Sequence, residues 1–83
     1  MKVKSLGSNK TELELKDLKI LVSYSTPVSA IRYNGKGAIK TDKFFSVTTS
    51  KHINQWLESN GYDPKLVPLM NQKYFDDILK DNS

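Results

Sequence analysis

The sequence predicts an α+β fold: a small antiparallel sheet of four to six short strands, covered on one face by one or two C-terminal helices. Three observations predict it. Apolar and polar residues alternate through the first half of the chain, and after residue 48 the apolar spacing becomes helical. The 83 residues suffice for one small core. We therefore expect a single domain, 1–83, with a β-rich part at 1–48 and a helical part at 49–83.

The first two strands follow from alternation and turn signals. Val3 opens a short strand that ends at a Gly-Ser-Asn-Lys turn. The next strand, 11–15, places its two leucines on one face and Glu12 and Glu14 on the other. This pattern predicts a half-buried strand whose glutamates lie in solvent.

The most apolar segment, 19–24, predicts a central strand, because neither of its faces is fully polar. Pro27 interrupts the pattern, since proline has no N–H to donate to a ladder. Alternation resumes over 28–33 and places Val28 and Ala30 on the same face.

A hairpin follows at Asn34-Gly35, the strongest short hairpin signal in the chain, because both residue types tolerate positive φ. We expect the returning strand at 37–41 and a further strand at 44–48.

A helix is predicted next. Its apolar face is made by Ile53, Trp56 and Leu57. Thr48, Thr49 or Ser50 is expected to cap its start, and Gly61 to end it in the left-handed conformation.

The C-terminal part carries two further start signals. Asp63-Pro64 predicts a single turn, and Asn71 is expected to cap a final helix. The apolar stripe of that helix is made by Tyr74, Phe75, Ile78 and Leu79. The stripe either closes the core or docks on a second copy of the chain.

Charge is distributed unevenly. Residues 1–43 hold nine Lys or Arg against four Asp or Glu, whereas residues 44–83 hold four against five. The chain as a whole has a net charge of +4. A basic β-rich half indicates an anionic partner.

The predicted hairpin is the first candidate site. Its basic residues are Arg32, Lys36, Lys40 and Lys43. We expect their side chains to converge on one open surface and to contact phosphates, with Tyr33, Phe44 or Phe45 stacking on an unpaired base. The alternative is an ordinary solvated hairpin whose lysines discourage edge-to-edge pairing.

The start of the predicted helix is the second candidate site. Ser50, Lys51 and His52 combine a hydroxyl, a positive charge and an imidazole near free backbone N–H groups, which suits a phosphate or a carboxylate. The alternative is plain capping beside a partly exposed histidine.

Catalysis and metal binding have little support. The chain has one histidine and no cysteine, so a thiolate metal site and a cysteine nucleophile are excluded. We expect no catalytic residue, no metal and no cofactor. The absence of cysteine suits the cytoplasm, and no apolar run has the length of a membrane span.

Several segments together resemble a known family. They are YSTPVSA at 24–30, residues 33–37, KTDK at 40–43 and SVTTSKHINQWL at 46–57. This pattern is similar to that of short domains of unknown function encoded by bacteriophages and mobile elements. The resemblance implies a phage setting and the host cytoplasm, and it offers no catalytic residue to transfer. The region from Tyr62 onward lies outside the pattern.

The expected function is that of a small, non-catalytic, phage-type accessory or regulatory protein that binds nucleic acid or a phosphate-bearing ligand through the basic hairpin. One alternative is a protein-binding inhibitor of a host enzyme, or a homo-oligomeric module, acting through the apolar C-terminal stripe. A further alternative is a sponge that sequesters a nucleotide signal.

Overall fold

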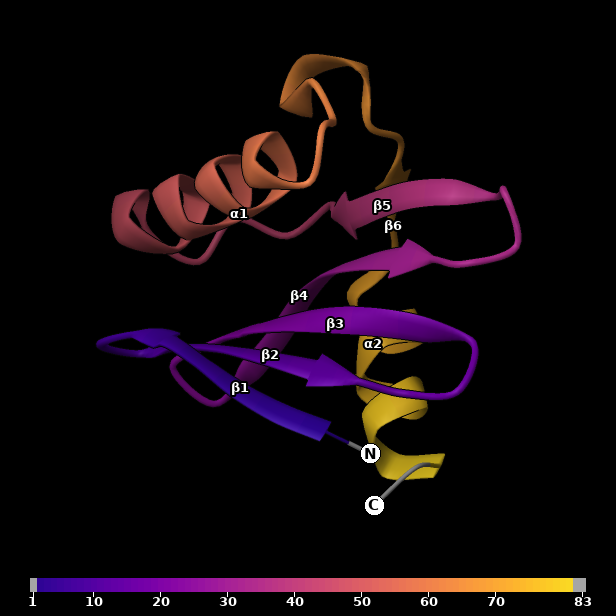
Figure 1. Ribbon diagram of the computed structural model, residues 1–83. Coiled ribbons are helices and arrows are strands. Elements are labelled where there is room, and N and C mark those ends of the chain that lie inside the picture. The colour runs from indigo at the N-terminus through magenta and orange to yellow at the C-terminus, as the bar shows by residue number, and fades with distance from the viewer. Residues whose placement is uncertain (1, 82–83) are drawn as a thin grey trace.

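The computed structural model describes residues 2–81 and consists of a six-stranded sheet with a helix on each face (Figure 1). The strands are β1 (Lys2–Gly7), β2 (Lys10–Glu14), β3 (Leu18–Ser23), β4 (Thr26–Arg32), β5 (Gly37–Thr41) and β6 (Leu69–Met70). The helices are α1 (Val47–Ser59), the 3₁₀ turn η1 (Pro64–Leu66) and α2 (Gln72–Asp81). The α+β class is therefore confirmed.

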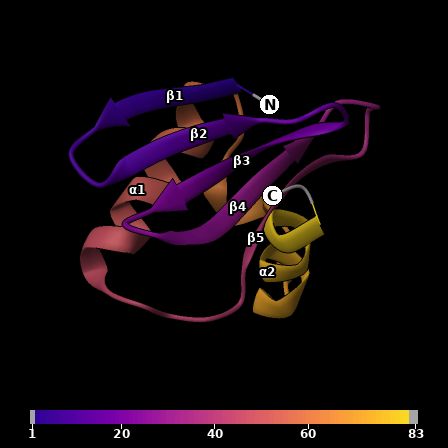
Figure 2. The same ribbon diagram turned by 90° about the horizontal axis from the view of Figure 1, so that it is seen from below.

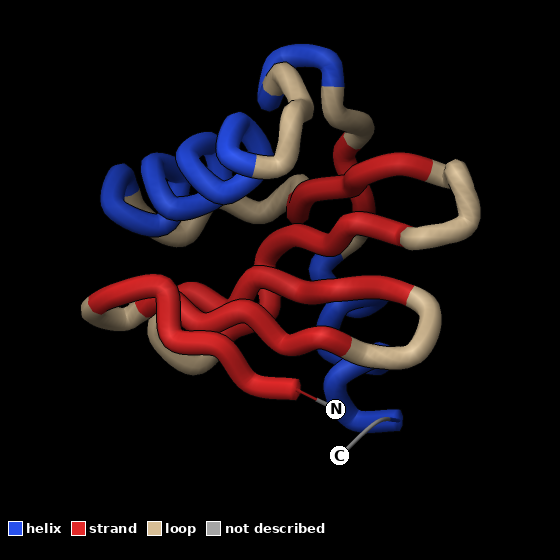
Figure 3. The backbone as a smooth tube through the Cα atoms, in the orientation of Figure 1, coloured by secondary structure: helices blue, strands red, loops and turns tan. Residues whose placement is uncertain are grey.

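The sheet is an antiparallel meander with one parallel addition. Strands β1 to β5 pair in sequence order, and the hairpin at Asn34-Gly35 joins β4 to β5 as expected. The chain then crosses through α1 and η1, so that β6 pairs with β5 in parallel. Figure 3 shows β6 as a short strand segment leading into α2. Two residues are too few for periodicity to predict a strand.

The two helices lie on opposite faces of the sheet, which corrects the expectation that both cover one face (Figure 2). On the side of α1, Leu21 and Ile31 pack against the helix. On the side of α2, Ile20 and Ala30 pack against Phe75. Because consecutive strand residues point to opposite faces, a strand that is apolar throughout needs a cover on both sides. We refer to these faces as the α1 side and the α2 side.

A β-bulge between β3 and β4 changes the predicted alternation. Leu21 pairs with Ser29, but Val22 pairs with Pro27, so Val28 is the extra residue. Val28 consequently packs on the α1 side and Ala30 on the α2 side, whereas simple alternation placed both on one face. The interruption expected at Pro27 takes the form of this bulge.

Helix α1 begins earlier than predicted, and the strand predicted at 44–48 is wrong. Residues 44–46 form a loop, and Ser46 caps the helix by accepting a hydrogen bond from the N–H of Thr49 at 3.1 Å. Aromatic and β-branched residues favoured a strand here, but the cap overrides that weak preference. At the other end, Gly61 has φ of 86° and follows the helix as expected.

Helix α2 begins as predicted and closes the second core. The side chain of Asn71 accepts a hydrogen bond from the N–H of Lys73 at 2.8 Å. Phe75 is fully buried, and Tyr74 and Ile78 pack around it. The apolar stripe thus closes the core, which is the first of its two expected roles. Within residues 2–81, neither helix has the length and hydropathy to cross a membrane.

Candidate anion-binding cleft

The four basic residues of the hairpin do not converge. Ala30 and Ile39 both lie in the core on the α2 side. Arg32, two residues after Ala30, therefore lies on the α2 side, and Lys40, one residue after Ile39, lies on the α1 side. The expectation of one common basic surface is wrong, because the side chains of Arg32 and Lys40 point to opposite faces of the sheet.

The guanidinium of Arg32 is used within the hairpin itself. Its Nη2 donates to the carbonyl oxygen of Lys36 at 2.9 Å, and its Nε donates to that of Gly37 at 3.3 Å. Arg32 therefore holds the turn closed, while the side chain of Lys36 extends from the exposed tip.

The other two hairpin lysines also have local contacts. The Nζ of Lys40 donates to the carbonyl oxygen of Pro64 at 2.7 Å and so ties β5 to η1. The Nζ of Lys43 lies 5.1 Å from the centre of the Phe45 ring, within cation–π range.

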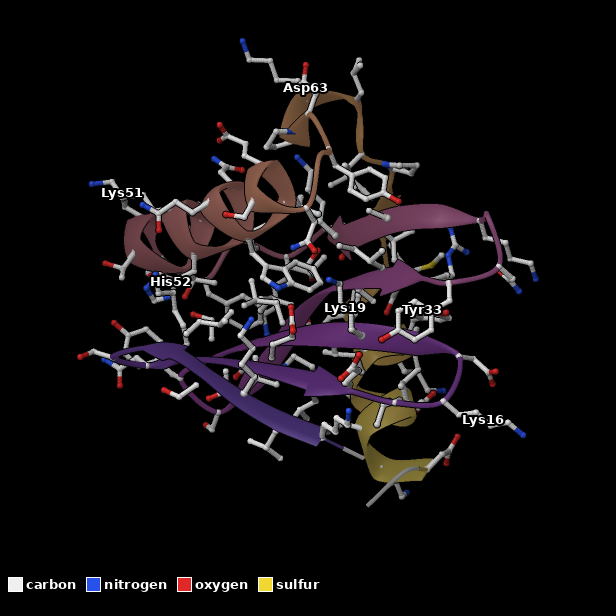
Figure 4. The ribbon with its side chains drawn as sticks, in the orientation of Figure 1. Lys16, Lys19, Tyr33, Lys51, His52 and Asp63 are labelled. Atoms are coloured by element: carbon white, nitrogen blue, oxygen red, sulfur yellow. The ribbon has the colours of Figure 1, made fainter. Side chains whose placement is uncertain are left out.

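The residues predicted at the start of α1 also separate. Lys51 is exposed on the outer surface of the helix, and His52 points from the helix toward the strands (Figure 4). Ser50 lies on the flank of α1 beside Phe44, in a small depression of about 230 Å³. The three side chains therefore do not form one site.

His52 is buried, with 9% of its surface exposed, which corrects the expectation of a partly exposed histidine. Its Nδ1 lies 2.9 Å from the Oγ of Ser23, and that oxygen lies 3.2 Å from the Oγ1 of Thr49. Burial, and then the positive charge of Lys10, lowers the pKa of His52 below its usual 6.5. The neutral imidazole is therefore favoured.

A cleft that the sequence did not reveal lies between α1 and the first three strands. Its volume is about 330 Å³. The residues that line it include Lys4, Lys10, Glu12, Lys19, His52 and Trp56. We call it the lysine cleft. It lies on the α1 side of the sheet, and Figure 1 shows β1, β2 and β3 below this helix.

Strand pairing brings the three lysines together. Lys4 of β1 pairs with Glu12 of β2, and Lys19 of β3 pairs with Glu14. Lys10 lies two residues before Glu12, so all these side chains point to the α1 side. The alternation at 11–15 predicted a polar face that carries Glu12 and Glu14. It did not predict that a helix would lie beside this face and form a cleft with it.

The inner wall of the lysine cleft is a hydrogen-bonded group. The indole Nε1 of Trp56 donates to the Oε1 of Glu12 at 2.8 Å. Lys19 lies 3.8 Å from the same carboxylate and donates to the Oδ1 of Asn60. Glu12 is only 13% exposed, so the expectation that both glutamates of β2 lie in solvent fails for Glu12. Trp56 is a core residue as expected, with its polar edge on the cleft.

The outer lysines have fewer partners. Lys10 donates to the side-chain oxygen of Gln55 at 3.4 Å, in an exposed contact. Across residues 2–81, no hydrogen bond or ion pair involves the side chain of Lys4. The cleft therefore carries three positive charges against one carboxylate, and that carboxylate is already engaged.

The family was identified by comparison with known proteins. A model described as "Family of unknown function (DUF8033)" matches residues 1–76. The chain belongs to the DUF8033 family. No curated protein matches the chain, and no solved structure matches it. The DUF8033 match includes η1, β6 and the first half of α2, which lie beyond the residues that carried the resemblance noted from the sequence.

The DUF8033 protein also has a larger depression, in which positive and negative charges are equal in number. It has a volume of about 760 Å³ and lies between α1, η1 and β5. Its two lysines, Lys40 and Lys65, are balanced by Glu58 and Asp63. It therefore has no net charge with which to attract an anion. Within residues 2–81, no group of three or more potential metal-binding side chains occurs.

Proposed function

We propose that this DUF8033 protein is a non-catalytic binding protein whose ligand carries phosphate groups, and that the ligand occupies the lysine cleft. The observation that carries the proposal is the meeting of Lys4, Lys10 and Lys19, from three strands, in one hollow. A half-enclosed site excludes part of the solvent, so each ammonium group attracts an anion more strongly than it would on a flat surface.

The carboxylate in the cleft does not cancel this attraction. Glu12 is held by Trp56 and Lys19, whereas Lys4 and Lys10 have no carboxylate partner among the described residues. An incoming phosphate group meets these two ammonium groups first. Charge-assisted hydrogen bonds to phosphate oxygens are among the stronger polar contacts that a protein makes.

A binding role without catalysis is supported by the state of the single imidazole. His52 is hydrogen-bonded to Ser23, whose hydroxyl is buried and shared with Thr49. A nucleophilic serine must reach its substrate, and this one lies beneath the helix.

The basic hairpin has a secondary role in attracting the ligand. Lys36 at its exposed tip adds to the positive field that attracts an anion over some distance. Arg32 and Lys40 act on the hairpin and η1 through the contacts described above.

The proposal is tested with inorganic pyrophosphate and two double variants of equal charge. Lys4→Gln with Lys10→Gln removes the outer cleft lysines, and Lys65→Gln with Lys73→Gln removes two lysines outside the cleft. Amide chemical shifts of the ¹⁵N-labelled protein report binding. We expect the first pair to weaken binding by at least about tenfold, from the loss of two charged hydrogen bonds, and the second pair by less than about twofold. Equal losses from both pairs would contradict the proposal.

The biological setting that we propose is a phage or mobile element acting in the host cytoplasm. It is supported by the resemblance of the segments at 24–30 and 46–57 to short domains of such elements. An accessory or regulatory role fits a small binding domain of this kind.

A second candidate function is protein binding, favoured by an exposed apolar surface at the start of α1. Phe44 is 71% exposed and Leu69 63% exposed, and both border the same depression of about 230 Å³. Val47, three residues after Phe44, is also exposed. The partner is a host enzyme or a second copy of the chain.

Sedimentation velocity separates these partners. Self-association that is lost in Phe44→Ser with Leu69→Ser supports a homo-oligomer. A monomer that binds a host enzyme supports the role of an inhibitor, provided that Phe44→Ser with Leu69→Ser abolishes this binding. A monomer that retains no protein removes this second candidate.

A further inference from the structure

We propose that the phosphate-bearing ligand of the lysine cleft is a single-stranded nucleic acid, with one base stacked on Tyr24 and another on Tyr33. The inference rests on the function proposed above for the cleft. It adds the chemical class of the ligand and its direction, which is along the strands.

The two tyrosines lie at opposite ends of the row of lysines. The N–H of Tyr24 donates to the carbonyl oxygen of Asn9 at 2.7 Å, directly beside Lys10. The hydroxyl of Tyr33 donates to the carboxylate of Glu14 at 3.5 Å, at the other end of β2. From Lys10 to Glu14 the strand advances by four residues, or roughly 13 Å.

The lysines lie between these ends. Figure 4 shows Lys19 between His52 and Tyr33 along the same side of the sheet. The ring of His52 lies 6.1 Å from that of Tyr24. The order along this side of the sheet is therefore an aromatic ring, the lysine cleft with its ammonium groups and a second aromatic ring, as a polymer with alternating bases and phosphates requires.

Both tyrosine rings are open to a ligand. Tyr24 is 54% exposed and Tyr33 47% exposed, and neither belongs to the core on either side of the sheet. Tyr24 also has φ of 58°, a conformation in which glycine or asparagine is the usual residue. This turn position leaves the Tyr24 ring more than half exposed beside His52, where an unpaired base can reach it.

The geometry favours a polymer over a mononucleotide. A ligand with a single base occupies one ring at a time, whereas a strand of several nucleotides spans the roughly 13 Å between the two ends. It also favours a single strand over a duplex. The lysines lie in a hollow walled by α1, and only unpaired bases present a free face to an aromatic side chain.

Fluorescence anisotropy with labelled 12-nucleotide oligo-dT, oligo-rU and a 12-base-pair duplex tests the inference. We expect single strands of either sugar to bind at least about tenfold more tightly than the duplex. Three phosphate contacts give the affinity for a single strand a logarithmic salt slope of about −2. Thymidine monophosphate is expected to compete only at concentrations far above that of the oligonucleotide.

The decisive variants are Tyr24→Asn, chosen because asparagine tolerates positive φ, and Tyr33→Ser. Each is expected to weaken single-strand binding by about tenfold through the loss of one stacked base, with little change in pyrophosphate binding. Leu66→Ser is the control, since it removes an exposed apolar side chain that does not line the cleft.

The outcomes separate the two proposals. Tyrosine variants that change single-strand affinity by less than about twofold overturn this inference, as does equal binding of the duplex or of the mononucleotide. If pyrophosphate binds through Lys4 and Lys10 but no oligonucleotide binds, the inference fails and the proposed function stands. If Lys4→Gln with Lys10→Gln alters neither ligand, both fail.

Discussion

Glu12 shows how one residue can belong both to the core and to the wall of the cleft. Its carboxylate accepts the indole N–H of Trp56, which lets a large ring enter the core without leaving its donor unsatisfied. The same carboxylate lies within 3.8 Å of Lys19 at the cleft wall. Strand alternation placed Glu12 on the correct face, but its partner is 44 residues away in the chain. No local pattern predicts such a contact.

Two substitutions at Glu12 are expected to separate its roles. Glu12→Ala leaves the Trp56 N–H buried without an acceptor and lowers the free energy of unfolding by about 1–3 kcal/mol. Glu12→Gln keeps an acceptor and removes the negative charge, so it raises the affinity for pyrophosphate with a smaller loss of stability. Urea unfolding and pyrophosphate titration measure the two effects. Weaker pyrophosphate binding by Glu12→Gln would contradict this view of the cleft.

His52 is expected to make the stability of the fold depend on pH. Its pKa is lowered by burial and then by Lys10, so the unfolded chain takes up a proton more readily than the folded one. The contribution of the neutral imidazole is therefore present above the unfolded pKa of about 6.5 and is lost as the pH falls through the lower folded value.

We therefore expect His52→Gln to lose less stability than the wild type between pH 7.5 and pH 5. Urea unfolding of both proteins at several pH values in this range measures the difference. Because the two proteins differ only at residue 52, the difference between their pH profiles reports on His52. Parallel pH profiles would show that the burial of His52 does not affect its protonation.

At the scale of the elements, three signals that act within a few residues gave correct predictions. Asn34-Gly35 formed its hairpin, Gly61 followed a helix, and Asn71 capped one. The cap of α1 was a local error, since Ser46 forms it and not a residue of 48–50. The other errors arose where a distant contact decides the outcome. The strand predicted at 44–48 has no neighbour to pair with, and β6 exists only because η1 returns the chain to β5.

The true start of α1 can be tested by alanine substitution. Ser46→Ala removes the side chain that caps the helix and is expected to lower the free energy of unfolding by about 1 kcal/mol. Thr48→Ala, at a position inside the helix, is the matched control and is expected to change it by less than about 0.5 kcal/mol. A larger loss from Thr48→Ala would place the cap where the sequence first indicated it.

For the whole molecule, the sheet divides into an α1 side, which holds one core and the lysine cleft, and an α2 side, which holds the core closed by Phe75. The sequence predicted the strands and the two helices, but not which face each helix covers, because a run such as Ile20-Leu21-Val22 suits either arrangement. The candidate site was therefore missed as well. Lys4, Lys10 and Lys19 become neighbours only through pairing register and the position of α1.

This division predicts that damage to the α2 side spares the ligand site. Phe75→Ala empties a fully buried position and is expected to lower the free energy of unfolding by about 3–5 kcal/mol. The molecules that remain folded, as judged by circular dichroism, are expected to bind pyrophosphate with wild-type affinity. A selective loss of binding in the folded fraction would mean that the two sides are coupled.

The central claim is that the ligand lies in the lysine cleft, and a chemical-shift map of the ¹⁵N-labelled protein with 12-nucleotide oligo-dT tests it most directly. We expect the largest amide shifts along β1, β2 and the second half of α1, with smaller ones at Tyr24 and Tyr33. Shifts confined to the tip of the β4–β5 hairpin, or spread over α2, would contradict the account.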